Sequence, residues 1–328
     1  MKMNRRHRPN PFLIFFIVLA VLVLSVSIPG SQALKPGEVS LVAEMQTGLR
    51  AIAAMDPDEN VRNPDYLAEK FLTPNFWFFG PLVKDYNKSR AFIKFYRVSG
   101  YYTANAMTRH LDNILQEIAA KNLEQVVNIG AGFDSRPYRF GKLLPNVRFF
   151  ELDQPATLSR KIEMVKGEFG ELPAGVTYLP VDCRTQYIFE SLKRAGYDEN
   201  KKTLFIWEGA TQYTDRKVVD FTLRSIAKHA ASGSEVVFDY ICDEVVRGDY
   251  SKYRGARFMA VRLTANGEPL KFGIAEGHSD EFITQRGFKV ISDLGPKELA
   301  KEYLVRSDGS IDGTPTAFVR VMHARVGP

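Results

Sequence analysis

The stretch Gln125–Arg139, QVVNIGAGFDSRPYR, decides how the rest of the chain is interpreted. An apolar run rich in β-branched residues ends at Gly130-Ala131-Gly132, and a stretch compatible with a helix follows Asp134-Ser135. Glycine suits such a turn because the chain reverses tightly and a ligand approaches the backbone with no Cβ in the way. The turn then offers free N–H groups at a helix N-terminus to an electron-rich ligand. We interpret the stretch as a strand that leads into a nucleotide-binding turn.

The same turn weighs against a nicotinamide dinucleotide as the ligand. The full dinucleotide fingerprint has a third glycine three residues after the second one. In this chain that position is Ser135. A nicotinamide-dependent oxidoreductase is therefore the less favoured interpretation.

A second predicted strand, Val147–Leu152, is followed by a carboxylate in the position of a ribose-binding acid. Asp153 lies 21 residues after Gly132. A carboxylate at the end of the second strand can accept hydrogen bonds from two ribose hydroxyls of an adenosine ligand. Glu151 competes for this role, because alternate residues of a strand point to the same face. Either acid could bind the ribose.

Three more apolar runs predict strands over Val176–Val181, Thr203–Trp207 and Glu235–Tyr240. Helical patterns separate them, which indicates a parallel, doubly wound α/β sheet. Ligands of such sheets bind outside the carboxyl ends of the strands. Besides Asp153, the acids in that position are Asp134, Asp182, Glu208 and Asp239. So many acids facing one crevice favour a polar ligand.

The clearest amphipathic helix is predicted over Ala104–Lys121, directly before the first strand. Further helices are predicted over 37–54, 155–166, 215–231 and 279–286. Thr214 is a plausible N-cap of the third of these, because a threonine oxygen can accept from the first free N–H groups of a helix.

Two late strands, Phe288–Leu294 and Ala317–Val326, suit an antiparallel hairpin at the edge of the sheet. Such a hairpin is typical of methyltransferases and not of nicotinamide-binding domains. We expect one α/β domain over residues 104–328, preceded by an N-terminal helical cap over residues 35–103.

The first 34 residues are expected to be a signal anchor or a signal peptide. A basic start precedes Phe12–Ile28, which is 17 residues long and has no charge. At ~1.5 Å per residue this helix would reach roughly 25 Å, just short of a hydrocarbon core of about 30 Å. Ser31-Gln32-Ala33 resembles a cleavage site. We expect a membrane protein with a single-pass anchor, with export after cleavage as the alternative.

Charge and cysteine content indicate neither a nucleic-acid partner nor a metal. The net charge is +6, but five cations and no acid lie within the first 35 residues, which leaves +1 for the remainder. That remainder has no basic surface for nucleic acid. Cys183 and Cys242 are not spaced as a zinc site.

Several segments together resemble the leucine carboxyl methyltransferase family, in its bacterial type that depends on S-adenosylmethionine. They are RAIAAMDPDENVRNPDYLAEKFL (Arg50–Leu72), QVVNIGAGFDSRPYRF (Gln125–Phe140), FFELDQPATLSRK (Phe149–Lys161), WEGATQYTDRKVVDFTLRSIA (Trp207–Ala227), GEPLKFGI (Gly267–Ile274) and RGFKVISDLGPKELAKEYL (Arg286–Leu304). The resemblance implies a class I methyltransferase fold, Rossmann-like, with S-adenosylmethionine as cofactor.

The resemblance also implies roles for individual residues. Gly130 matches the glycine under the methionine part of the cofactor, and Asp153 matches the ribose acid. Asp182 and Cys183 match the pair near the adenine. Glu208 matches the acid after the fourth strand, and Tyr213 the tyrosine near the methyl donor. We expect the remaining turn residues, Ala131, Gly132 and Asp134, to contact the cofactor as well.

One position departs from the family pattern. The family's Ala-Arg-Thr, whose arginine binds the cofactor carboxylate, is Ala106-Met107-Thr108 here. Methionine cannot form that ion pair. Arg109 points elsewhere on a helix, and Arg136 is a possible substitute.

The expected function is methyl transfer from S-adenosylmethionine to a carboxylate or hydroxyl of a small molecule or a protein C-terminus. Tyr213 would orient the acceptor. The alternative is a protein that binds S-adenosylmethionine with little or no turnover. The sequence leaves open the acceptor, the side of the membrane, cleavage of the leader and the oligomeric state.

Overall fold

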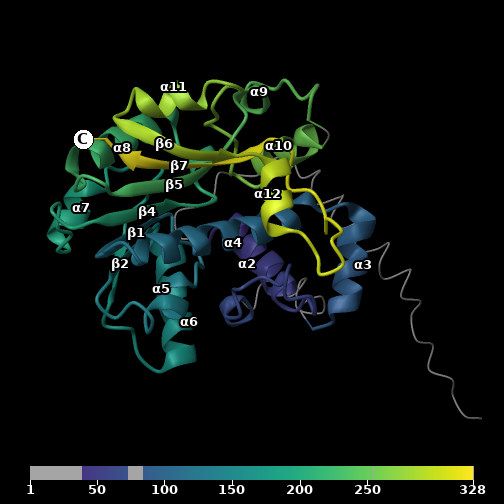
Figure 1. Cartoon of the computed structure of the whole chain (residues 1–328), viewed down its shortest axis with the longest axis horizontal. Coiled ribbons are helices and arrows are strands. Elements are labelled where there is room, and N and C mark those ends of the chain that lie inside the picture. Colours follow the sequence, from purple (N-terminus) through teal and green to yellow (C-terminus); the bar gives the residue numbers. More distant parts are fainter. Residues whose placement is uncertain (1–38, 73–83, 254, 328) are drawn as a thin grey trace, which may run out of the picture.

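The computed structural model describes residues 39–72, 84–253 and 255–327. Its centre is a seven-stranded sheet with the order β3-β2-β1-β4-β5-β7-β6 (Figure 1). The strands are β1 (Gln125–Ile129), β2 (Arg148–Asp153), β3 (Val176–Pro180), β4 (Thr203–Trp207), β5 (Glu235–Ile241), β6 (Phe288–Leu294) and β7 (Val319–Val326). The first five are parallel, and β7 pairs antiparallel with both β5 and β6. The predicted class I fold and its edge hairpin are confirmed.

Helices cover both faces of the sheet (Figure 1). The helical segments are α2 (Leu41–Ala54), η2 (Ala68–Phe71), α3 (Tyr86–Tyr96), α4 (Ser99–Ala119), α5 (Arg136–Phe140), α6 (Pro155–Phe169), α7 (Phe189–Arg194), η3 (Thr211–Tyr213), α8 (Arg216–His229), α9 (Asp243–Val246), α10 (Ala256–Ala265), α11 (Ser279–Thr284) and α12 (Pro296–Tyr303). On one face α4 packs against α2 and α12, and on the other α7 and α8 cover the central strands.

Side-chain alternation in the central strands explains the two cores. In β4, Leu204 and Ile206 join the core beneath α4, whereas Phe205 and Trp207 join the core beneath α8. Every residue of β1, β4 and β5 is buried. Strands that are buried on both faces read as continuous apolar runs. That is why the sequence marked them so clearly.

The strand order reverses direction at β1, which pairs with β2 on one side and with β4 on the other. The loops that leave the carboxyl ends of β1 and β4 therefore run to opposite sides, and a crevice opens between them. This switch point is where the residues singled out in the sequence come together.

The predicted strands agree with the structure to within two residues at each end, whereas one helix cap was wrong. The N-cap of α8 is Asp215, not Thr214. The Thr214 hydroxyl instead donates to the carbonyl of Ala210 at 3.0 Å, which closes the preceding turn.

The predicted membrane location is corrected by the structure. Among residues 39–72, 84–253 and 255–327, no helix is long and apolar enough to cross a membrane. The longest, α4, has 21 residues but includes Arg109, Asp112 and Glu117. Phe12–Ile28, on which the anchor prediction was based, lies outside the described residues. The prediction of a membrane protein with a transmembrane helix is therefore wrong for the part of the chain that the structure describes.

Candidate active site

A single cavity of about 1460 Å³, part of it open to solvent, lies outside the carboxyl ends of β1 to β5. Nine of the ten predicted site residues line it: Gly130, Ala131, Gly132, Asp134, Asp153, Asp182, Cys183, Glu208 and Tyr213. The tenth, Arg136, lies behind the cavity wall. Residues that are far apart in the sequence thus converge because the ends of parallel strands share one edge of the sheet.

The turn after β1 requires glycine at two positions. Gly130 and Gly132 have φ angles of +70° and +45°, in the left-handed region. A Cβ at Gly130 would also lie 2.9 Å from the Cβ of Ala210. The sequence suggested that the N–H of Gly132 is free to bind a ligand. In the structure it donates to Asp153 Oδ2 at 2.6 Å. The turn therefore positions the acid at the end of β2.

Asp153, and not Glu151, faces the cavity, although both lie on β2. The Glu151 carboxylate is fully buried and contacts Lys161 Nζ at 2.5 Å and the Tyr138 hydroxyl at 2.9 Å. Within the part of the chain that the structure describes, Asp153 accepts hydrogen bonds from backbone groups alone, the N–H groups of Gly132 and Gln154. Burial raises the pKa of Asp153. Its carboxylate retains acceptor capacity toward the cavity, which suits a pair of hydroxyl donors.

At the end of β3, Asp182 is held by a neighbouring arginine. Arg184 donates to both carboxylate oxygens, at 2.9 and 2.8 Å, and this hydrogen bonding lowers the pKa of Asp182. Burial raises the pKa of the adjacent Cys183 thiol. Cys183 is therefore a neutral wall residue, while Asp182 remains an ionised acceptor.

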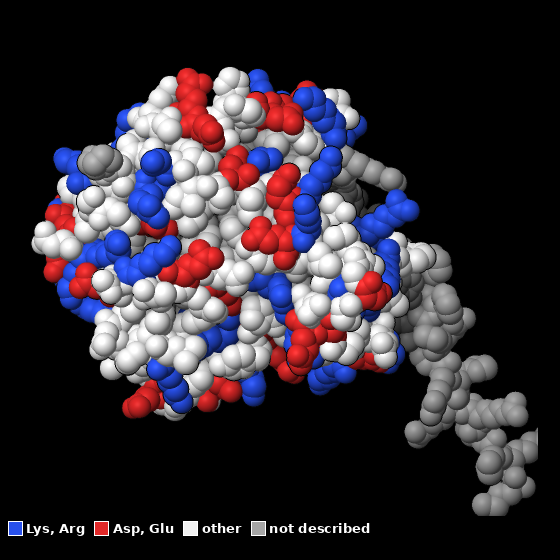
Figure 2. Space-filling model, in the orientation of Figure 1, with Lys and Arg blue, Asp and Glu red and all other residues white. Residues whose placement is uncertain are grey.

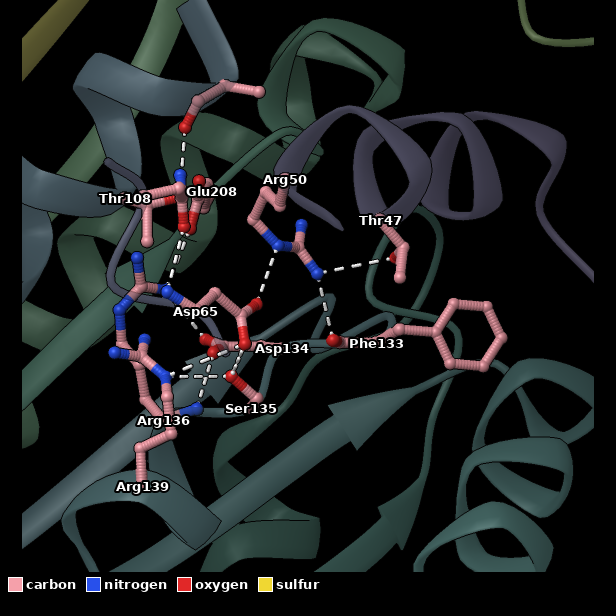
Figure 3. A network of polar contacts seen from close by, with 12 residues as sticks. Thr47, Arg50, Asp65, Thr108, Phe133, Asp134, Ser135, Arg136, Arg139 and Glu208 are labelled. Atoms are coloured by element: carbon pink, nitrogen blue, oxygen red, sulfur yellow. Dashed lines mark hydrogen bonds and ion pairs between the residues drawn. The ribbon is translucent and has the colours of Figure 1, made fainter. Parts of the chain in front are cut away.

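Arg136 is the centre of a buried group of charges that we call the charged floor (Figure 3). It consists of Arg136 and Arg139 with three carboxylates: Asp112, Asp134 and Glu208. Arg136 contacts all three carboxylates at 2.8 Å and is 3% exposed. Burial alone would raise the pKa of Asp134, but the charges of Arg136, Lys161 and Arg139, together with the hydrogen bond from the Arg136 N–H, outweigh it and hold that pKa well below its usual value. The floor holds Asp134 as a carboxylate and positions Glu208 beside it at the cavity wall.

Arg136 is a poor substitute for the missing family arginine, because its guanidinium already serves three carboxylates. Arg109 is also engaged, since it donates to the carbonyl of Arg62 at 2.7 Å. Met107 does line the cavity, as the sequence position implied.

Arg50 is the cavity cation that the sequence interpretation missed. It lies on α2, which packs against the helix that carries Met107, and both residues line the cavity. Its Nε donates to Asp65 at 2.9 Å and its Nη2 to the carbonyl of Phe133 at 2.9 Å (Figure 3). Arg50 begins the first segment of family resemblance, but nothing in its local sequence shows that α2 lies over the glycine turn.

The opposite end of the cavity, which we call the β5 end, lies beyond Glu208 along the strand order. It is lined by Gln212, Tyr213, Asp239, Ile241, Met259, Leu270, Thr316 and Val319. Burial raises the pKa of Tyr213 and brings that of Asp239 to about 7. Asp239 was noted in the sequence only as one acid among several.

The rim of the cavity between its two ends is closed by a contact that the sequence did not suggest. Glu268 accepts from the Ser40 hydroxyl at 2.9 Å and from the Val42 N–H at 3.4 Å. These bonds connect the start of α2 to the loop after α10. Glu268 is 5% exposed, and burial raises its pKa.

Surface charges do not form a single field over the face shown in Figure 2. Lysine and arginine side chains are interspersed there with aspartate and glutamate side chains. The charges that distinguish this molecule therefore lie inside, around the cavity.

Comparison with known proteins agrees with this architecture. The family model described as leucine carboxyl methyltransferase matches residues 43–227. A crystal structure titled as a "putative methyltransferase from Thermobifida fusca" superposes with a TM-score of 0.55 at 13% identity, covering 90% of this chain and 97% of that one. That likeness shows the fold.

Two relatives illustrate the sequence similarity. "Putative S-adenosyl-L-methionine-dependent methyltransferase YktD" of Bacillus subtilis is 25% identical over 197 residues, which are 60% of this chain and 64% of YktD, slightly under two thirds. A protein named in the same way in Mycolicibacterium smegmatis is 27% identical over 297 residues, or 86% of this chain and 92% of its own length. These names confirm the predicted cofactor, S-adenosylmethionine, at the level of the family. Since the family model matches more than half of its length, the chain belongs to the leucine carboxyl methyltransferase family.

Proposed function

We propose that the chain transfers the methyl group of S-adenosylmethionine to an oxygen atom, a carboxylate or a hydroxyl, of a small molecule or a protein C-terminus. One observation carries the proposal: the acids at the ends of β3, β2, β4 and β5 line one cavity together with the glycine turn. Neighbouring strands lie about 4.8 Å apart, so the rim from β3 to β5 extends roughly 19 Å. That length accommodates a nucleoside at one end and an acceptor at the other.

The cofactor would lie over β3, β2 and β1. Asp153 would accept from the ribose hydroxyls, since its carboxylate is otherwise held by backbone alone. Asp182 and Cys183 would contact the adenine, and the bare backbone of Gly130–Gly132 would admit the methionine part. When bound, S-adenosylmethionine supplies a methyl group on a positively charged sulfur. Asp134 and Glu208, which Arg136 contacts in the charged floor, would provide the opposite charge.

Arg50 would bind the cofactor carboxylate in place of the residue at position 107. It lines the same cavity as Met107, and its helix α2 packs against α4, which carries Met107. Because Asp65, Thr47 and Phe133 already accept from its Nε and Nη2, Arg50 would contact the cofactor carboxylate through Nη1, as a charge-assisted hydrogen bond. Tyr213 would orient the acceptor from η3.

The test is to incubate the protein with S-adenosylmethionine that carries a labelled methyl group and with an extract of the source organism. Mass spectrometry then identifies the molecule that gains the label. Calorimetry with unlabelled cofactor is measured in parallel. Binding without label on any molecule would favour the alternative of a binding protein without turnover, which Met107 motivates.

Thermal unfolding separates the remaining alternative. A ligand that binds the folded state raises its unfolding temperature. We expect S-adenosylmethionine to raise it and NAD to leave it unchanged. The reverse result would indicate a nicotinamide-dependent protein instead.

A further inference from the structure

The β5 end of the cavity combines apolar walls with one acid that has no cationic partner. Ile241, Met259, Leu270 and Val319 contribute apolar surface. Asp239 is 5% exposed, and it accepts hydrogen bonds from the N–H of Gly209, at 2.6 Å, and from the side chain of Gln212. It forms no ion pair with any residue of 39–72, 84–253 and 255–327. Asp239 differs in this respect from Glu208, one strand away, which Arg136 contacts at 2.8 Å.

A carboxylate acceptor is poorly matched to this end of the cavity. Of the two arginines that line the described part of the cavity, Arg50 donates to the carbonyl of Phe133 in the glycine turn and Arg184 pairs with Asp182 at the end of β3, so both lie on the cofactor side. An acceptor carboxylate would therefore approach Asp239 without a compensating cation. Like charges about 4 Å apart in such surroundings weaken binding by roughly 10²- to 10³-fold. A neutral hydroxyl meets no such repulsion and can donate to Asp239.

We propose that Asp239 is the general base of the reaction and that the acceptor is a hydroxyl group on an otherwise apolar molecule. This inference rests on the proposed methyl transfer. The acceptor O–H proton moves to a carboxylate oxygen of Asp239 while the acceptor oxygen forms a bond to the methyl carbon. The C–S bond breaks and its electron pair stays on sulfur. The products are a methyl ether, a neutral thioether and protonated Asp239.

The surroundings of Asp239 suit a group that exchanges a proton near neutral pH. Burial raises its pKa to about 7, and the neighbouring Glu208 acts in the same direction. The titratable groups that face it are Glu208 at the end of β4 and Tyr213 in η3. A base is most effective when its pKa lies near the working pH.

The first test determines the chemical class of the product. The protein is incubated with tritiated-methyl S-adenosylmethionine and an extract of the source organism, and the labelled product is treated with mild alkali. A methyl ether retains its label, which is the expected result. A methyl ester releases volatile tritiated methanol, and that result would overturn the hydroxyl assignment while leaving the methyltransferase proposal intact. Absence of any labelled product would overturn both.

The second test examines the residue. Asp239→Asn should reduce label transfer to the same acceptor by roughly 10²- to 10⁴-fold. Binding of S-adenosylmethionine, measured by calorimetry, should change less than threefold, because Asp239 lies beyond the cofactor end. Asp239→Glu should recover part of the rate. Asp220→Asn, at an acid of α8 that pairs with Arg224 and Arg286 and does not line the cavity, is the control and should transfer label at the rate of the unmodified protein.

The pH profile provides the readout that a merely structural role would not change. The rate of the unmodified protein should rise with pH and level off above about 7, as Asp239 loses its proton. Asp239→Asn should lose this rise. Transfer by Asp239→Asn within threefold of the unmodified protein, or a rate that falls as pH rises through 7, would overturn the assignment.

Discussion

The charged floor and the β5 end of the same cavity use buried acids in opposite ways. In the floor, Arg136 contacts Asp112, Asp134 and Glu208, so each carboxylate has a cation. At the β5 end, Asp239 has a backbone N–H and no cation among the described residues. A paired buried charge keeps its ionisation and its place, whereas an unpaired one changes its pKa. The charged floor is therefore a structural support, whereas Asp239 at the β5 end can exchange a proton.

Removing the central cation of the floor should have the largest effect. Arg136→Met leaves the buried Asp112 and the partly buried Asp134 and Glu208 without their common partner, which should lower the free energy of unfolding by about 3–5 kcal/mol. Denaturant unfolding followed by circular dichroism measures the change. Arg224→Met removes an arginine that is 53% exposed and pairs with Asp220, and it should cost less than about 1 kcal/mol. Similar losses in the two variants would show that the floor is not the support we describe.

The β5 end should respond in the opposite direction. Because the folded-state pKa of Asp239 is raised to about 7 from its ordinary value of 3.8, its ionisation destabilises the fold between those two pH values. Asp239→Asn removes this penalty. The variant should match the unmodified protein near pH 4 and exceed it above pH 7, by up to about 4 kcal/mol. Unfolding measured from pH 4 to pH 8 checks this, and a constant difference across the range would contradict it.

The acid at the end of β2 should affect ligand affinity. Asp153→Ala removes charged hydrogen bonds to the ribose and should weaken binding of S-adenosylmethionine by roughly 1.5–3 kcal/mol. Titration calorimetry measures the change. Asp220→Asn serves again as the control with unchanged affinity. Unchanged affinity in Asp153→Ala would remove the ribose assignment.

The smallest expected effect concerns the cofactor carboxylate. Arg50→Gln should weaken binding of S-adenosylmethionine about tenfold, or roughly 1.4 kcal/mol, through loss of one charged contact. Binding of 5′-methylthioadenosine, which lacks the amino-acid carboxylate, should not change. Adding Met107→Arg should restore affinity, because it returns the family cation from the neighbouring helix. An equal loss for both ligands would indicate that Arg50 acts through α2 packing alone.

Local sequence patterns predicted the elements of this fold well for a physical reason. Strands buried on both faces, such as Thr203–Trp207, are continuous apolar runs, and the helix that precedes β1 shows its apolar stripe. The glycines at 130 and 132 are needed because the backbone there has positive φ. These signals are local, so they can be interpreted without the fold. The N-cap at Asp215 was missed because two adjacent polar residues offered equivalent capping oxygens.

The sequence by itself determined that acids follow the strands and that a glycine turn follows the first strand. The tertiary structure alone decided how each acid behaves. Lys161 forms a buried ion pair with Glu151, so Asp153 is the acid of β2 that faces the cavity. Arg136 pairs with Glu208, whereas Asp239 has no cationic partner among the described residues. The tertiary structure also brought Arg50 into the cavity that Met107 lines, through the packing of α2 on α4. Ionisation and affinity depend on charges within a few ångströms, and those neighbours come from distant parts of the chain.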